Sequence, residues 1–148
     1  MIKFAISPLE GVKNQGIARE WALCNYFGVP RTKHDSVPFN KGSDLIAQGM
    51  KISIKASDFT LMAGNLCHGY TDFDDIWNVF ETESHSDTFA YITNNYDVFL
   101  MNMDEFKTLV YTFCTIAKES SKNGGKTKIR CRKESAKMRE WLERALAA

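Results

Sequence analysis

The segment 42–56 constrains the fold most strongly, because apolar residues alternate on both sides of a central Gln48-Gly49 pair. Glycine adopts the positive φ of a tight turn without strain, so this pattern predicts a β-hairpin. With a two-residue turn, Asp44 faces Ser53 across the hairpin. Successive side chains in a strand point to opposite faces. The apolar face is then expected to carry Leu45, Ala47, Met50, Ile52, Ile54 and Ala56, and the other face Asp44, Ile46, Lys51, Ser53 and Lys55.

The other periodic segments predict a mixed α/β (α+β) domain. Helices are expected at 15–27, about 72–83, 105–118 and 133–147, and further strands at 37–40, 88–93, 97–101 and 127–132. The segment 58–62 either extends the sheet or turns away from it. The order is α-β-β-β-α-β-β-α-β-α, which indicates a central mixed sheet flanked by helices. A length of 148 residues suits a single domain spanning 1–148.

Composition and cysteine spacing restrict the cellular location that we expect and the kinds of metal or disulfide site that the chain could contain. No apolar run approaches the roughly 18 residues of a membrane span, so no membrane partner is expected. The first residues lack the long apolar region of a signal peptide. The cysteines contain no Cys-x-x-Cys pair, which argues against a zinc site and a disulfide framework. They are Cys24, Cys67, Cys114 and Cys131. A cytoplasmic location is therefore the default expectation.

Glu20 lies in the first predicted helix, on the same face as apolar residues. Its neighbours at helical spacing are Ile17, Leu23, Cys24 and Phe27. This spacing directs the carboxylate inward. A buried carboxylate is costly without a cation, a metal or hydrogen-bond donors. Glu20 is therefore either a functional carboxylate or a side chain at the edge of the stripe that reaches back to water.

The charged residues form two opposed blocks. The segment 71–106 contains acidic residues and no lysine or arginine, whereas the segment 118–139 is strongly basic. A dense basic run is typical of a surface that binds a polyanion, although a solvated helix face and loop would give the same pattern. The residues expected to contact phosphates are Lys122, Lys126, Lys128, Arg130, Arg132 and Lys133.

Four polar residues suggest metal-assisted phosphodiester hydrolysis: Glu20, Asp44, Ser53 and Lys55. Mg²⁺ (or Mn²⁺) prefers oxygen ligands and is usually held by one or two carboxylates, waters and the phosphate itself. Asp44 would be the principal ligand, with Glu20 and the carbonyl oxygen of Ile54 as further ligands. The metal would activate the attacking water, and Lys55 would orient that water or stabilise charge on the phosphorus.

At these positions the chain resembles the PD-(D/E)XK nuclease superfamily, with its restriction-endonuclease-like fold. The matching residues are Glu20 on the first helix, Asp44 in Gly42-Ser43-Asp44, and Lys55 in Ser53-Ile54-Lys55. The resemblance covers about two thirds of the chain, and it implies a magnesium-dependent DNA endonuclease of the restriction, repair or resolvase type. The chain departs from the pattern at Ser53, where the family has a second acidic ligand.

Two other functions stay open. A nuclease-like domain that has lost its second acidic ligand would bind DNA, or RNA, without cleaving it. A protein-interaction domain would instead use the opposed charge blocks for self-association, for example as a homodimer, or for binding another protein. A serine hydrolase is not indicated, because no Gly-x-Ser-x-Gly segment occurs.

Overall fold

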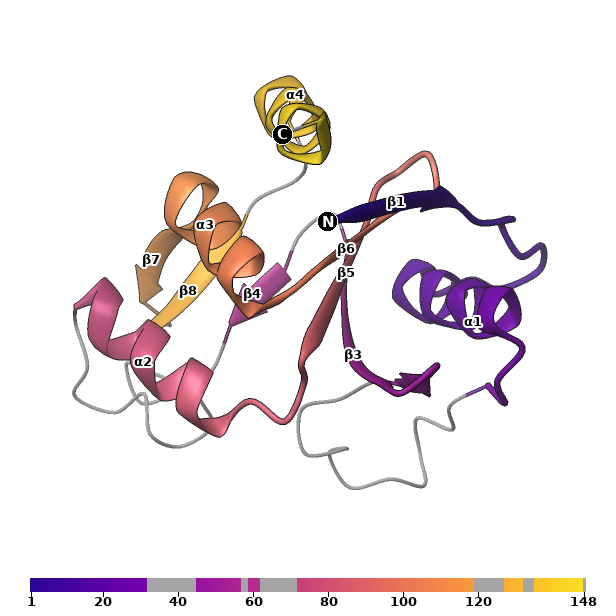
Figure 1. Ribbon diagram of the computed structural model, residues 1–148, viewed down its shortest axis with the longest axis horizontal. Helices are drawn as coiled ribbons and strands as arrows, with labels where there is room; N and C mark the ends of the chain where they lie inside the picture. The colour runs from indigo at the N-terminus through magenta and orange to yellow at the C-terminus, as the bar shows by residue number, and fades with distance from the viewer. Residues whose placement is uncertain (32–44, 57–58, 62–71, 119–126, 132–134, 148) are drawn as a thin grey trace.

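A computed structural model describes residues 1–31, 45–56, 59–61, 72–118, 127–131 and 135–147. These residues form eight strands and four helices (Figure 1). The strands are β1 (Ile2–Ala5), β2 (Leu45–Ala47), β3 (Met50–Ala56), β4 (Phe59–Leu61), β5 (Thr88–Ile92), β6 (Asp97–Met101), β7 (Thr115–Lys118) and β8 (Thr127–Cys131). The helices are α1 (Gln15–Phe27), α2 (Phe73–Glu83), α3 (Met103–Phe113) and α4 (Ala136–Ala147). None of them is long and apolar enough to cross a membrane.

The strands form two sheets. The larger sheet has the order β1-β6-β5-β3-β2, and the smaller one has the order β4-β8-β7. In the larger sheet β3 and β5 run parallel, whereas the other neighbouring strands run antiparallel. A parallel pair needs a crossover connection, and here β4 and α2 lie between the two strands in the chain. The mixed α/β class expected from the sequence is confirmed.

Both faces of the larger sheet are covered, by α1 on one side and by α2 and α3 on the other (Figure 1). Side chains of β5 alternate between the two: Phe89 and Tyr91 pack on the α3 side, and Ala90 and Ile92 on the α1 side. We call these the α3-side core and the α1-side core. All four residues are buried, which is why β5 is apolar from Phe89 to Ile92 instead of alternating.

Helix α1 has the bounds that the sequence predicts. The Asn14 side chain accepts a hydrogen bond from the backbone N–H of Ile17 and so caps the first turn. At the other end Gly28 adopts φ 67°, the left-handed conformation that ends a helix at little cost for glycine. Glu20 lies within this helix and is buried, so the expectation that its side chain points inward is confirmed.

The β2–β3 hairpin has the predicted two-residue turn and register. Ala47 pairs with Met50, and Ile46 pairs with Lys51. Both turn residues have positive φ, 49° at Gln48 and 76° at Gly49, as a type I′ turn requires. The expected pair between Asp44 and Ser53 lies one step beyond the described part of β2.

Helix α3 and the strand after it differ from the expectation. Asn102 and Glu105 form a capping box that starts the helix at Met103. The helix ends at Phe113 and not near residue 118, because Thr115 and the next three residues pair with β8 as strand β7. Strand β1 was likewise not predicted, and β4 resolves the open question at 58–62 in favour of a second sheet. The strand expected at 37–40 lies outside the described residues.

Candidate functional site

Strand β3 places Ser53 and Lys55 on the same face of the larger sheet. Ser53 is in register with Phe89 and Lys55 with Tyr91 on the parallel strand β5. Paired residues on neighbouring strands share a face, and both aromatic residues belong to the α3-side core. Ser53 and Lys55 therefore lie on that side as well, next to each other along the strand, as the sequence predicts.

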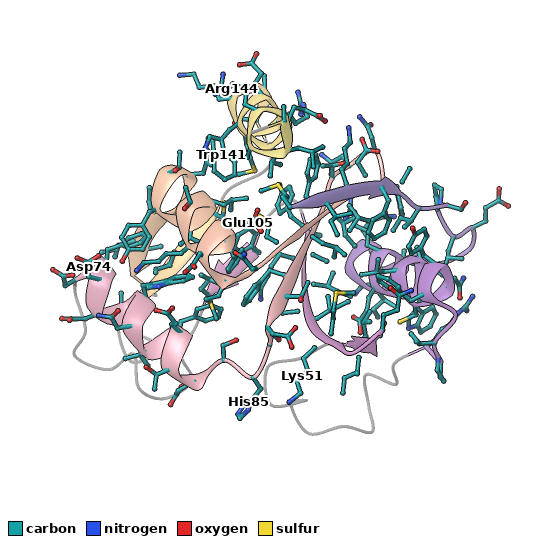
Figure 2. The ribbon with its side chains drawn as sticks, viewed as in Figure 1. Lys51, Asp74, His85, Glu105, Trp141 and Arg144 are labelled. Atoms are coloured by element: carbon teal, nitrogen blue, oxygen red, sulfur yellow. The ribbon has the colours of Figure 1, made fainter. Side chains whose placement is uncertain are left out.

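The face of the β2–β3 hairpin that carries Ser53 and Lys55 is exposed to solvent only near the hairpin turn. At the hairpin, Ile46 is 64% exposed and Lys51 is exposed on the rim of the molecule (Figure 2). Further along β3, Ser53 is only 5% exposed and Lys55 is half-buried. Hydrophobic packing does not explain a hydroxyl and an ammonium at these two positions. We therefore expect a polar functional site at this covered end of β3.

The carbonyl oxygen of Ile54 points toward the β2 side of β3. Its direction follows from Lys51, whose backbone N–H donates to Oδ1 of Asp87 and whose carbonyl accepts from the Asp87 N–H, both at 3.0 Å. Asp87 lies directly before β5, so the polar backbone groups of Lys51 point toward β5. Backbone groups alternate along a strand, and the pairing of β3 with β5 is continuous from Ile52 to Ala56. The Ile54 carbonyl therefore faces away from β5.

Among the described residues, no strand pairs with the last four residues of β3 on this outer side, because β2 begins at Leu45 opposite Ile52. Asp44 itself lies outside the described residues.

Glu20 approaches from the opposite face. Its helix packs through Leu23 and Cys24 into the α1-side core together with Ile52. Glu20 is 7% exposed, so it is buried on the α1 side of the sheet. The sheet thus separates Glu20 from the face that carries Ser53 and Lys55. A metal ion would contact both Glu20 and that face only at an edge of the sheet.

Arg19 fixes the position of the first half of α1 along the sheet. Its guanidinium donates to Oδ1 of Asn94 at 3.1 Å and stacks over the Tyr96 ring at 5.7 Å. Both partners lie in the turn after β5, and β5 ends where Ile92 is in register with Ala56. Glu20 follows Arg19 directly, so it lies over the same end of the sheet as Ile54 and Lys55.

Asp87 is a carboxylate beside β3 that the sequence did not single out. Its Oδ1 atom accepts hydrogen bonds from the Lys51 backbone N–H and from the Thr88 hydroxyl, the latter at 2.8 Å. Asp87 lies at the hairpin end of β3, several residues from Lys55. These bonds fasten the hairpin to β5, so Asp87 has a structural role here. In the described ranges, no three His, Cys, Asp or Glu side chains gather into a metal-binding cluster.

The predicted basic strand has one buried and one exposed face. In β8, Ile129 and Cys131 are buried and Arg130 is exposed, in register with Thr115 of β7. The other expected phosphate contacts cannot be placed: the side chain of Lys128, and Lys122, Lys126, Arg132 and Lys133 entirely, lie outside the described residues. Arg130 is therefore the member of this group whose exposure is established.

Comparison with known proteins adds no family to this geometry. No protein-family model matches the chain, no curated protein matches it, and no solved structure matches its fold.

Proposed function

We propose that the chain is a metal-dependent nuclease whose centre lies at the outer edge of β3. The observation that carries the proposal is the segment Ser53-Ile54-Lys55, which runs along a central strand parallel to β5, with a buried carboxylate on the helix that covers it. The mixed α/β architecture, with α1 before the β2–β3 hairpin and a parallel crossover to β5, is compatible with the fold that the PD-(D/E)XK resemblance implies.

Mg²⁺ or Mn²⁺ would be held by Asp44, by the Ile54 carbonyl and by Glu20. The donor set suits such an ion, because these cations take oxygen ligands and retain several waters. The carbonyl of Ile54 points away from β5, to the outer edge of β3. Glu20 supplies a buried carboxylate as a further oxygen ligand. When bound, the metal would polarise a phosphoryl oxygen and lower the pKa of a water molecule.

Lys55 is the residue that we expect to act on the substrate. Lys55 is half-buried and in register with Tyr91 on the covered face of the sheet. A lysine in such a place can pack its aliphatic stem on apolar residues while its ammonium contacts the substrate. From there it orients the attacking water or stabilises the negative charge that develops on the phosphate. DNA is the preferred substrate, with RNA as the other candidate, and Arg130 contributes to a surface that contacts phosphates.

The second candidate is a domain that binds nucleic acid without cutting it. Ser53 favours this function, because a neutral hydroxyl replaces the second acidic ligand and binds Mg²⁺ more weakly than a carboxylate does. In that case the basic residues retain their role, whereas Asp44 and Lys55 contribute little to affinity.

The decisive experiment is cleavage of supercoiled and linear DNA with Mg²⁺ or Mn²⁺, using the wild-type chain, Asp44→Ala and Lys55→Ala. Lys51→Ala is the matched control, because it removes a lysine from the same strand and the same face but at the exposed hairpin end. We expect Lys55→Ala to lower the rate by roughly 100-fold or more, while Lys51→Ala leaves it nearly unchanged.

The other outcomes separate the alternatives. If no variant and no metal gives cleavage but DNA is retarded in a gel-shift assay, the chain is a binding domain. If the chain neither cuts nor binds DNA or RNA, the nuclease proposal is wrong, and the acidic segment 71–106 becomes the surface to test for protein binding. Thermal melts of every variant would distinguish loss of activity from loss of fold.

A further inference from the structure

Two cysteines face each other where the smaller sheet meets the end of α3. In the β7–β8 ladder, Thr115 pairs with Arg130. The next pair outward in the same register is Cys114 with Cys131. Cys131 is the last residue of β8, and Cys114 follows the last residue of α3. The two residues flank the consecutive strands β7 and β8, and the pairing of these strands brings them together.

The backbone geometry of this pair suits a disulfide. Cys114 has φ −97° and ψ 156°, an extended conformation that continues the line of β7. Residues directly opposite in antiparallel strands have Cα atoms roughly 4.5–5.5 Å apart. Disulfides span Cα separations of roughly 4.4–6.8 Å. The Cα separation expected for this pair therefore lies within the range that a disulfide spans.

The side chains are also in contact. The thiols of Cys114 and Cys131 are hydrogen-bonded to each other, and both belong to the α3-side core. Both are thiols in the structure, so this contact is the reduced form of the pair. Cys24 is buried in the α1-side core, on the other side of the larger sheet. Among the described cysteines, Cys114 and Cys131 are thus the two that can react with each other.

We propose that Cys114 and Cys131 are a reversible disulfide pair that is oxidised by a small-molecule disulfide of the glutathione type. In the first step, the Cys114 thiolate attacks the disulfide, forms a mixed disulfide and releases one glutathione thiolate. In the second step, the Cys131 thiolate attacks the sulfur of Cys114 and releases the second glutathione. The protein loses two electrons and two protons, and one glutathione disulfide becomes two glutathione thiols.

Exposure and acidity decide how this reaction proceeds. Cys114 is 7% exposed and Cys131 is fully buried, so Cys114 meets the oxidant first. The hydrogen bond to Cys131 and burial together raise the pKa of the Cys114 thiol well above its usual range. Since the thiolate is the nucleophile, exchange in the native protein is slow. The pair should be measured at equilibrium, so that a slow rate is not mistaken for an absent bond.

The experiment equilibrates the full chain at graded ratios of glutathione disulfide to glutathione, starting from native protein and from urea-unfolded protein that is diluted to refold. Peptide mapping by mass spectrometry then identifies the bond. We expect a single intramolecular disulfide between Cys114 and Cys131, reached from both starting points. Closing this loop of about 16 residues should raise Tm by roughly 6–12 °C.

Two variants complete the test. Cys114→Ser changes the more exposed partner and should abolish both the disulfide and the rise in Tm. Cys24→Ala leaves the pair intact and should show the same bond and the same rise. The proposal is overturned if the oxidised wild-type chain carries glutathione on separate cysteines, joins a different pair, or melts at the same temperature as the reduced chain.

Discussion

Replacing Ser53 by aspartate tests the edge of β3 as a metal site directly. The change restores the acidic residue that the PD-(D/E)XK pattern has at this position. Ser53→Asn is the matched control, because asparagine has nearly the same shape as aspartate and carries no charge. Any difference between the two variants therefore reports the carboxylate, and not the larger side chain.

The burial of Ser53 determines the expected magnitude. At 5% exposure, the hydroxyl is almost completely removed from water. Leaving a buried polar group without adequate partners costs about 1–3 kcal/mol, and more for a charge. In the presence of a chelator, Ser53→Asp should therefore be less stable than Ser53→Asn by about 1–3 kcal/mol. For a chain of this length, that lowers Tm by roughly 2–12 °C.

Metal should reverse this loss selectively. A cation at about 100 times its Kd stabilises the folded state by about 2.7 kcal/mol. Thermal melts with EDTA, Mg²⁺ and Mn²⁺ should then show a rise in Tm of roughly 5–11 °C for Ser53→Asp that exceeds the rise for Ser53→Asn. If the two variants respond to metal identically, no metal binds beside Ser53, and the proposed centre is misplaced. Adding Asp44→Ala to Ser53→Asp should remove most of the rise.

Three further measurements test the fold around the site. Phe106 stacks on Phe89 with ring centroids 4.2 Å apart, so Phe106→Ala should cost about 3–5 kcal/mol in urea unfolding, and a cost below about 1 kcal/mol would contradict this packing. Asn102→Ala should cost about 1 kcal/mol through loss of the α3 cap, whereas Asn102→Asp should retain most of the stability. Partial burial and the hydrogen bond to Asp74 raise the pKa of Tyr111 to about 12. The contribution of Tyr111 to stability should therefore be lost as pH rises from about 10 through 12, and ultraviolet titration should show Asp74→Asn moving this pKa toward its ordinary value.

The elements that the sequence predicts well are those with local signals. Asn14 and Gly28 mark the two ends of α1, and the Gln48-Gly49 pair fixes the hairpin register. The strands at 88–93 and 97–101 follow from two apolar runs, and Asn94-Asn95 between them lies in the turn that joins β5 to its antiparallel neighbour β6. In each case a cap or a turn residue determines the backbone within a few residues, so no knowledge of distant segments is needed.

The elements that were missed depend on partners far away in the chain. Strand β7 looks like a continuation of α3, because Phe113 still fits the helical spacing; only the pairing with β8 shows that the helix has ended. Strand β1 has four residues and pairs with β6, so nothing near it in the sequence indicates a strand. The alternation of apolar and polar residues along β3 correctly predicted which residues lie on each face of the strand. It could not show that α2 and α3 cover the face that carries Ser53, since that layer comes from later segments.

The position of β1 has a consequence for folding. Ile2 pairs with Leu100, so this ladder closes a loop that contains most of the chain, whereas β5, β6 and α3 follow one another directly. Contacts between distant segments pay a larger loop-closure entropy and form later than local ones. We infer that the β5–β6 hairpin and α3 assemble early and that β1 adds to the sheet last. Backbone amides of β1 should then exchange with solvent through small openings that leave β5 and β6 intact.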